Sequence, residues 1–250
     1  MFAVVKTVYT RPKGIRKILS KRPVCLLKKM KISNSYYYEL TVNHRSKKIN
    51  WDKVFKTVNV CDVPVIMPKN QNIDPTQNVR PFYAKIFWGI IYANCAGRIY
   101  PSNSKAFVID NDFDNSDALY ILLKNFKEVS VFTTNEQKYE HLKTKAENEL
   151  GISPVFCDSL TAAQNADFLI NLQHSECTCV NKNILGQGGY TFSHSDIRLP
   201  KNIERLVPRN ISPFVFAAAV YELSKIQSLG DCTVTKLKNN ATGKIIEIKN

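Results

Sequence analysis

Four aspartates follow a short apolar run in the middle of the chain. The run is Lys105–Asp110, and the polar stretch that continues from it, residues 110–117, contains no glycine and has carboxylates at positions 110, 112, 114 and 117. An apolar run of this length is typical of a buried parallel strand. Carboxylate oxygens suit a hard cation, whereas a pyrophosphate needs bare backbone N–H groups and a positive field. The acidic stretch therefore disfavours a phosphate-binding loop.

A cation site is one interpretation of this stretch. The Asp-x-Asp spacing after a strand resembles the Mg²⁺ site of haloacid-dehalogenase phosphatases, in which a second strand ends in Ser or Thr, and Thr133 or Thr134 is available. Against it, a helix is expected from Ser116, which leaves no room for that family's flap. A calcium loop fits less well, because Asn115 stands where its turn glycine belongs and Ile121 where its closing glutamate belongs.

A capped turn between a strand and a helix is the interpretation that we favour. Asn115 or Ser116 would serve as the N-cap of the helix, and Asp117 would interact favourably with the positive end of the helix dipole. The stretch then needs neither a metal ion nor a phosphate. We predict no metal site here.

Three further polar clusters have residue types that occur in catalytic or binding sites. His174, Cys177 and Cys179 lack the fourth ligand and the Cys-x₂₋₄-Cys spacing of a zinc site. Gly186–Gly189 lacks the Lys-Ser/Thr ending of a phosphate loop, and we expect a turn into a strand. Ser193–Asp196 contains Ser, His and Asp side by side, whereas a hydrolase triad is assembled in space. All three are predicted to be ordinary loops.

Alternating strand and helix patterns extend from residue 105 to residue 172. Strands are expected at 106–109, 129–132, 154–157 and 167–172, with helices at 116–126 and 135–150. Short connections between such units imply a parallel sheet with right-handed crossovers. Beyond it, we expect a strand within 186–192, an apolar helix at 211–229 and a hairpin at 233–248.

The residues before this region form a different kind of module. Residues 1–80 contain several β-rich runs and a short helix at 50–58 with Asn50 as its N-cap, which predicts a small, antiparallel-rich α+β module. A helix opened by Arg80-Pro81 would link it, over 81–104, to a second domain at 105–250. Residues 1–100 carry 19 Lys and Arg against 4 acidic residues, whereas residues 101–250 are nearly neutral. This change in charge supports two modules.

The second module resembles the cofactor domain of shikimate-dehydrogenase-like proteins, in the Rossmann-like superfamily. Phe132–Asn135 stands where that family's second strand ends at the adenosine ribose, and Ala166–Asn171 is similar to its fourth strand. The resemblance implies an α/β fold with a mostly parallel Rossmann-like sheet, and NAD or NADP as cofactor. It would place the cofactor site at Asp110, Asn111, Asp112, Thr133, Thr134 and Asn135, although the family's glycine-rich loop is absent.

The sequence is compatible with three classes of function. The acidic turn favours an atypical or non-catalytic protein that binds a small molecule; an NAD(P)-dependent oxidoreductase with a non-standard phosphate loop is the alternative. The Lys- and Arg-rich stretch within residues 11–48, with Tyr36, Tyr37 and Tyr38, adds nucleic-acid binding as a third. No membrane-length apolar run or signal peptide is evident, so we expect a cytoplasmic protein with no membrane partner. The scattered cysteines do not suggest a disulfide framework.

Overall fold

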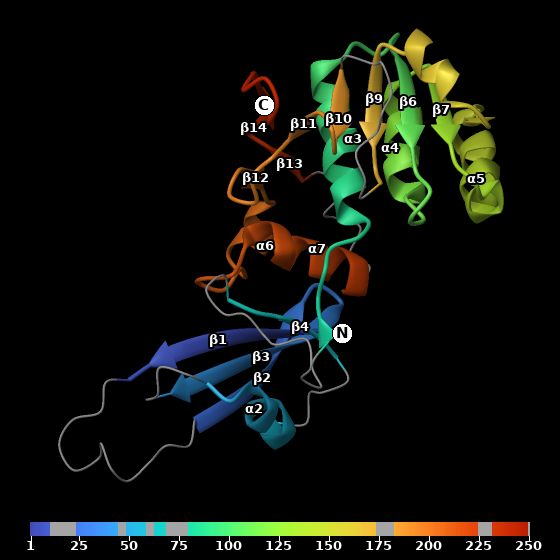
Figure 1. Ribbon diagram of the computed structural model, residues 1–250. Helices are drawn as coiled ribbons and strands as arrows, with labels where there is room; N and C mark the ends of the chain where they lie inside the picture. The colour runs from blue at the N-terminus through green and yellow to red at the C-terminus, as the bar shows by residue number, and fades with distance from the viewer. Residues whose placement is uncertain are drawn as a thin grey trace, which may run out of the picture. The chain divides into compact units, whose positions relative to one another are not determined.

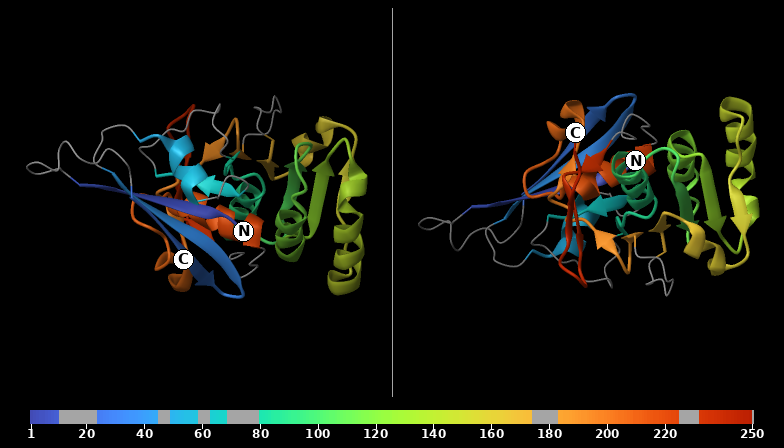
Figure 2. Two further views of the ribbon diagram at one scale, coloured as in Figure 1. Left: turned by 90° about the horizontal axis from the view of Figure 1, so that it is seen from below. Right: turned by 90° about the horizontal axis from the view of Figure 1, so that it is seen from above.

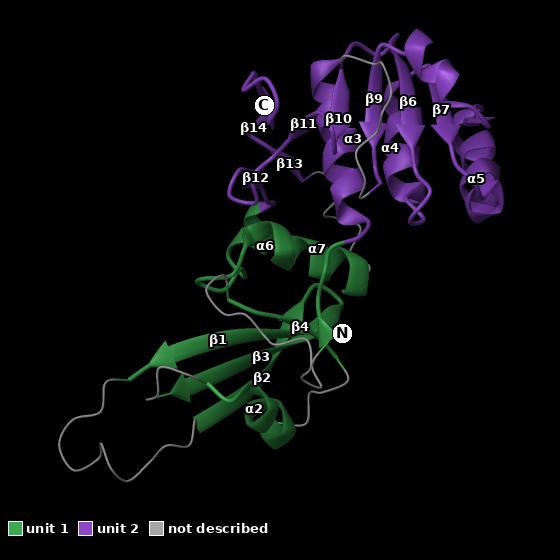
Figure 3. Cartoon of the chain, viewed as in Figure 1, with its two compact units in different colours: residues 1–84, 201–228 green, residues 85–200, 229–250 purple. Residues whose placement is uncertain are grey.

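A computed structural model describes residues 1–10, 24–44, 49–58, 63–68, 80–173, 183–224 and 232–249. The chain divides into two compact units (Figures 1 and 3). Unit 1 contains residues 1–84 and 201–228, and unit 2 contains residues 85–200 and 229–250. The sequence placed the 211–229 helix in the second domain. The structure groups it with unit 1, because the Phe216 ring packs edge-on against Phe2 and Tyr37.

Unit 1 is built on a five-stranded sheet in the order β2-β3-β1-β4-β5. The strands are β1 (Ala3–Tyr9), β2 (Val24–Ile32), β3 (Ser35–His44), β4 (Pro64–Ile66) and β5 (Arg80–Pro81). Only the β2–β3 pair is antiparallel, whereas β1 runs parallel to β3 and β4, and β4 to β5. The expected antiparallel-rich sheet is therefore a mixed sheet.

Helices cover both faces of this sheet. On one face, α2 (Trp51–Val58) joins a core cluster with Ala3, Val5, Leu40 and Val42. The backbone N–H of Lys53 donates to Asn50 Oδ1 at 3.0 Å, which confirms Asn50 as the cap of this helix. On the other face, Phe2 and Tyr37 stack and meet α7 (Pro213–Ser224), which follows the short α6 (Lys201–Glu204).

Unit 2 contains an eight-stranded sheet in the order β15-β14-β11-β10-β9-β6-β7-β8. Six strands run parallel: β6 (Lys105–Ile109), β7 (Glu128–Phe132), β8 (Val155–Cys157), β9 (Phe168–Asn171), β10 (Ile184–Gly186) and β11 (Tyr190–Thr191). Numbered along the chain, these six lie in the order 3-2-1-4-5-6, which is that of the dinucleotide-binding doubly wound fold. The Rossmann-like α/β fold is therefore confirmed by the topology itself.

Helices complete unit 2. Helix α4 (Ser116–Asn125) lies between α3 (Phe87–Ile99) and α5 (Glu140–Leu150), as the views in Figures 1 and 2 agree. The short 3₁₀ helices η1 (Glu136–Tyr139) and η2 (Leu160–Asn165) complete the connections, and Ala163 of η2 packs on Phe107, Ile109 and Leu169.

The remaining strands are antiparallel. They are β14 (Lys236–Asn239) and β15 (Ile245–Glu247), which form the expected hairpin, and β12 (Ile197–Arg198) and β13 (Thr233–Val234), which form a separate pair.

The segment of chain that joins unit 1 to unit 2 differs from the sequence expectation. The linking helix was predicted to start at Arg80-Pro81, but these two residues form β5. The backbone N–H of Phe82 donates to Val65 O at 2.9 Å, so the chain continues beside β4 rather than coiling. The helix itself, α3, begins at Phe87 and belongs to unit 2. No helix among the described residues is long and apolar enough to cross a membrane.

Candidate functional site

The acidic turn (residues 110–117) is held together by Asp110. This carboxylate is fully buried at the end of β6 and accepts hydrogen bonds from Asn115 Nδ2 at 3.0 Å and from the Tyr139 hydroxyl. Lys138 Nζ lies 3.7 Å from its Oδ1. A buried carboxylate needs such partners, because an unpaired buried charge is costly. Asp110 is therefore a structural centre of the turn.

The side chain of Lys138 also binds the backbone of the acidic turn. Its Nζ donates to the carbonyl oxygens of Asp110 at 2.9 Å and Phe113 at 2.8 Å. Burial, followed by the adjacent Asp110 charge, raises the pKa of the Tyr139 hydroxyl. Tyr139 consequently stays protonated and remains a donor to Asp110 across the physiological pH range. All three groups are engaged in contacts inside the protein.

The N-terminus of α4 is capped by the turn's own carboxylate. The backbone N–H of Ser116 donates to Asp114 Oδ1 at 3.0 Å. Asn115 occupies the N-cap position, as predicted, but its side chain makes no capping hydrogen bond because it points to Asp110. In dinucleotide-binding folds the pyrophosphate sits at this helix N-terminus. Here a carboxylate of the protein takes the corresponding place.

The six residues predicted to contact a cofactor lie at the carboxyl ends of β6 and β7. The turns after these strands are joined, because Asn111 Oδ1 accepts from the backbone N–H of Thr134 at 2.8 Å. Thr133 is buried, and its Oγ1 accepts from the N–H of Asn135 at 3.2 Å. Asp112 is exposed. The structure thus brings these residues together, and their binding of a cofactor stays a prediction.

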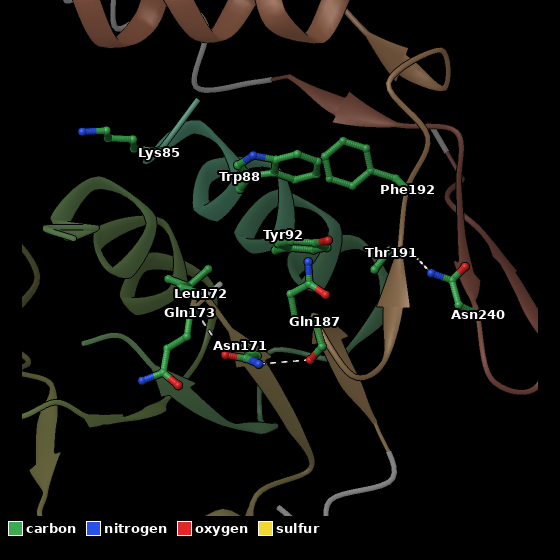
Figure 4. A pocket seen from close by; sticks show the side chains of 10 residues that line it. All are labelled: Lys85, Trp88, Tyr92, Asn171, Leu172, Gln173, Gln187, Thr191, Phe192 and Asn240. Carbon is green, nitrogen blue, oxygen red and sulfur yellow. Dashed lines mark hydrogen bonds between the residues drawn. The ribbon is translucent and has the colours of Figure 1, made fainter. Parts of the chain in front are cut away.

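A pocket of about 330 Å³ opens nearby, at the carboxyl ends of β9 and β10 (Figure 4). We call it the aromatic pocket. Ligands of open α/β sheets bind outside the carboxyl ends of the strands, so this position is the one expected of a binding site. Its described lining residues come from α3 and the residue two positions ahead of it, from the ends of β9 and β11, and from the segments that follow β9, β10, β11 and β14: Lys85, Trp88, Tyr92, Asn171, Leu172, Gln173, Gln187, Thr191, Phe192 and Asn240.

Three aromatic rings form one wall of the aromatic pocket. The ring centroids of Trp88 and Phe192 lie 4.8 Å apart, and those of Tyr92 and Phe192 lie 5.5 Å apart. Trp88 and Tyr92 are one helical turn apart on α3, so both rings project from the same face of the helix. Burial raises the pKa of the Tyr92 hydroxyl, which keeps it neutral. This wall offers flat apolar surface to a ligand.

Amide groups form the opposite side. Asn171 is buried at the end of β9; its Nδ2 donates to Gln187 O at 3.0 Å, and its Oδ1 accepts from the N–H of Gln173 at 3.1 Å. Asn240 Nδ2 donates to Thr191 Oγ1 at 3.2 Å. In Figure 4 the Gln187 side chain extends toward Tyr92. Amides both donate and accept, so this side can pair with a polar edge.

Close backbone packing explains the glycines of Gly186–Gly189. A Cβ at Gly186 would lie 2.3 Å from the carbonyl oxygen of Asn171, and one at Gly189 would lie 2.1 Å from that of Ile184. Gly186 also has a φ of +104°. The N–H of Gly189 donates back to Gly186 O at 3.1 Å, which makes the predicted turn. These glycines let β10 and β11 meet beside the pocket.

Lys85 connects the aromatic pocket with the acidic turn. It contributes to the pocket lining, and its Nζ lies 5.4 Å from the centroid of the Phe113 ring. The described lining contains this one cation and no carboxylate. In Figure 4 the Lys85 ammonium points away from the other lining side chains, and the rest of the described lining is uncharged.

Sequence reasoning missed the aromatic pocket. The available signals were the spacing of Trp88 and Tyr92 on a predicted helix and a polar Asn171 closing an apolar strand. Among the other predicted clusters, His174, Cys177 and Cys179 lie outside the described residues. Ser193 and Ser195 pair with each other at 2.9 Å, whereas the His194 ring lies 5.4 Å from the Trp88 ring, as expected of a loop. The described residues contain no metal-binding cluster.

No protein-family model matches the chain, and no curated protein does. Solved structures show distant likeness. Quinate dehydrogenase from Corynebacterium glutamicum in complex with NAD is 9% identical with a TM-score of 0.29, covering 53% of this chain and 60% of its own. Shikimate dehydrogenase from Aquifex aeolicus is 9% identical with a TM-score of 0.26, covering 54% and 58%.

A third solved structure is Δ(1)-pyrroline-2-carboxylate reductase from Thermococcus litoralis with NADH and L-proline. It is 18% identical with a TM-score of 0.27, covering 34% of this chain and 27% of its own. This chain thus spans between about a quarter and three fifths of these three proteins. The fold assignment rests on the strand order of unit 2.

Proposed function

We propose that this protein binds a small, planar, polar organic molecule in the aromatic pocket, without a dinucleotide's pyrophosphate at the acidic turn. The observation that carries the proposal is the pairing of the Trp88, Tyr92 and Phe192 wall with amide side chains at the carboxyl edge of the sheet. Aromatic walls stack on flat ligands, and amides recognise their polar edges. Heteroaromatic amides and nucleobases have this chemistry.

The acidic turn supports the exclusion of a pyrophosphate. Asp114 already accepts from the first N–H of α4, and Lys138 is committed to Asp110 and two carbonyl groups. Like charges repel, although water and salt weaken this repulsion at an exposed site. The exposed carboxylates of Asp112 and Asp114 therefore disfavour a phosphate at this turn.

The proposed activity is binding. The described lining offers no carboxylate, and burial keeps the Tyr92 hydroxyl protonated, so it is a hydrogen-bonding group rather than a base. The alternative is an NAD(P)-dependent oxidoreductase with a non-standard phosphate loop. It is favoured by one observation, the dinucleotide-type strand order with a pocket at its carboxyl edge.

Titration with nicotinamide, uracil, adenine and NADH separates these two functions. Binding is followed by calorimetry and by quenching of tryptophan fluorescence, since Trp88 lines the pocket while Trp51 is buried in unit 1. We expect a planar neutral probe to bind, and NADH to bind no tighter. Trp88→Ala should weaken binding about ten- to a hundredfold, the usual worth of one stacked aromatic.

The exposed Tyr83 provides a matched control, because it is aromatic and not part of the pocket lining. Tyr83→Ala should leave affinity unchanged. NADH binding at micromolar Kd, with nicotinamide at least a hundredfold weaker, would show that phosphates contribute and would favour the oxidoreductase. Failure of every planar probe to bind would contradict the binding proposal.

Nucleic-acid binding by the basic N-terminal segment is a further candidate. Part of residues 11–48 lies outside the described ranges; in the described part, β2 has Lys28, Lys29 and Lys31 exposed, and Lys29 Nζ lies 4.3 Å from the centroid of the Tyr36 ring. Cations beside an exposed aromatic suit single-stranded nucleic acid. A gel shift with mixed RNA that weakens as salt increases is the expected result. An absent or salt-independent shift excludes it.

A further inference from the structure

A second pocket lies entirely within unit 1, on the sheet face opposite α2. Side chains alternate along β1 and β3, so Val5 and Leu40 face α2 while Lys6 and Glu39 face the other way. On that side a pocket of about 460 Å³ lies between the sheet and the segment 205–210. This volume is within the range of small-molecule sites. We call it the arginine pocket.

The side chains that line the arginine pocket carry a net positive charge. Lys6, Arg205 and Arg209 line it, with Glu39 as the one carboxylate of its described lining. Glu39 is mostly buried and already pairs with Lys6, at 2.6 Å between Nζ and Oε2. Among the residues that the structure describes, neither the Arg205 nor the Arg209 guanidinium forms an ion pair. The pocket therefore presents two arginines whose charge is not compensated inside it.

The rest of the lining is largely apolar. Val8 and Met30 from the sheet, and Leu206, Val207 and Pro208 from the opposing segment, line the same pocket as the two arginines. Planar guanidinium groups bind carboxylates in paired hydrogen bonds, and aliphatic side chains bury an apolar body. A ligand that satisfies both needs one anionic end and one apolar end.

We propose that the arginine pocket binds an organic carboxylate, an aliphatic or aromatic acid whose carboxylate pairs with Arg205 and Arg209 and whose apolar body contacts Met30 and Pro208. This site is independent of the aromatic pocket, which belongs to unit 2. The two pockets therefore allow one protein to bind two different small molecules.

Titration of the full chain with hexanoate, hexanamide and inorganic phosphate tests the proposal. Hexanamide keeps the apolar body without the charge, and phosphate keeps the charge without the body. Hexanoate should bind at least tenfold more tightly than either. Equal affinity for hexanamide would show that the site recognises only the apolar body. Equal affinity for phosphate would show that it recognises only the negative charge. Either outcome would overturn the proposal.

Two arginine variants and one lysine variant locate the contact. Arg205→Gln and Arg209→Gln should each weaken hexanoate binding about tenfold or more. Lys201→Gln is the matched control, because Lys201 is an exposed cation of α6 outside the lining and its change should have no effect. An equal loss in all three variants would show that general surface charge, not the pocket, attracts the anion.

Methionine methyl resonances provide a second readout that does not depend on affinity. The chain has 3 methionines, and Met30 lines the arginine pocket whereas Met67 packs on the α2 side of the sheet. With methyl-labelled methionine, hexanoate should shift the Met30 signal and leave Met67 in place, the assignment coming from Met30→Leu. A saturable interaction without a shift at Met30 would refute this location.

Discussion

Replacing Gly89 by alanine tests how tightly α3 is packed against the start of α4. A Cβ at Gly89 would lie 2.8 Å from Asn115 Oδ1 and 3.1 Å from the Cβ of Ala118. Asn115 is buried, and its Nδ2 donates to Asp110 at 3.0 Å, so this amide cannot turn aside without losing a bond to a buried carboxylate. The added methyl group therefore has no free space.

Two opposing effects set the magnitude. Alanine is favoured over glycine inside a helix by about 0.8–1.0 kcal/mol. Overpacking a well-packed contact costs about 1–3 kcal/mol, and loss of a hydrogen bond to a charged group costs about 1.5–3 kcal/mol. The two costs together exceed the gain, so we expect Gly89→Ala to lower the stability of unit 2 by about 1.5–5 kcal/mol.

Gly97→Ala is the matched control within the same helix. Gly97 is exposed, and its Cβ would be 3.3 Å from the nearest atom, in the side chain of Asn125. This variant should be neutral or stabilising by up to about 1 kcal/mol. Native-state hydrogen exchange of peptides from α3 and α4 measures unit 2 separately, which matters because a chain of two units need not unfold in one step. Equal exchange protection in the two variants would refute the packing argument.

Three further outcomes are expected. Tyr139→Phe removes a donor to buried Asp110 and should cost about 1–3 kcal/mol, measured by hydrogen exchange in unit 2; no loss would show that Lys138 and Asn115 suffice. Burial raises the pKa of Tyr37 and Tyr100 to about 12, so these hydroxyls ionise at lower pH in the unfolded chain than in the folded one. The free energy of unfolding should therefore fall as pH rises from 10 to 12. An absorbance titration in which both hydroxyls ionise at their ordinary pKa, with no fall in stability, would contradict this. Asn50→Ala should destabilise unit 1 by about 0.5–2 kcal/mol in thermal unfolding, and an unchanged transition would contradict the cap.

Local pattern predicted much of unit 2. The apolar runs that became β6, β7 and β9 are short and bounded by polar turns, and their alternation with helices leaves few topologies open. The turn after β6 was also foreseen as a capped strand-to-helix connection. The capping residue differs from the prediction: the N–H of Ser116 donates to Asp114, not to Asn115. The Asn115 side chain instead donates to the buried carboxylate of Asp110.

Long-range packing explains what local pattern could not predict. The apolar α7 is compatible with either module, and only the contact of Phe216 with Phe2 and Tyr37 assigns it to unit 1. Likewise, β1 and β3 are β-rich runs whose parallel pairing depends on strands brought together from distant positions. The aromatic pocket requires α3, β9, β10 and β11 to meet, so no single stretch of sequence contains it.

Unit 1 is built from two segments that are far apart in the sequence, and this affects how it forms during synthesis of the chain. Its sheet is complete in sequence by residue 84, but the helix that covers Phe2 and Tyr37 belongs to residues 201–228. At about 5–20 residues per second, translation of the intervening residues 85–200 takes roughly 6–23 s. During this interval the nascent sheet lacks the helix that covers its aromatic face, and exposed apolar surface of this kind is prone to aggregation. A polypeptide stopped at residue 200 would keep that face uncovered permanently.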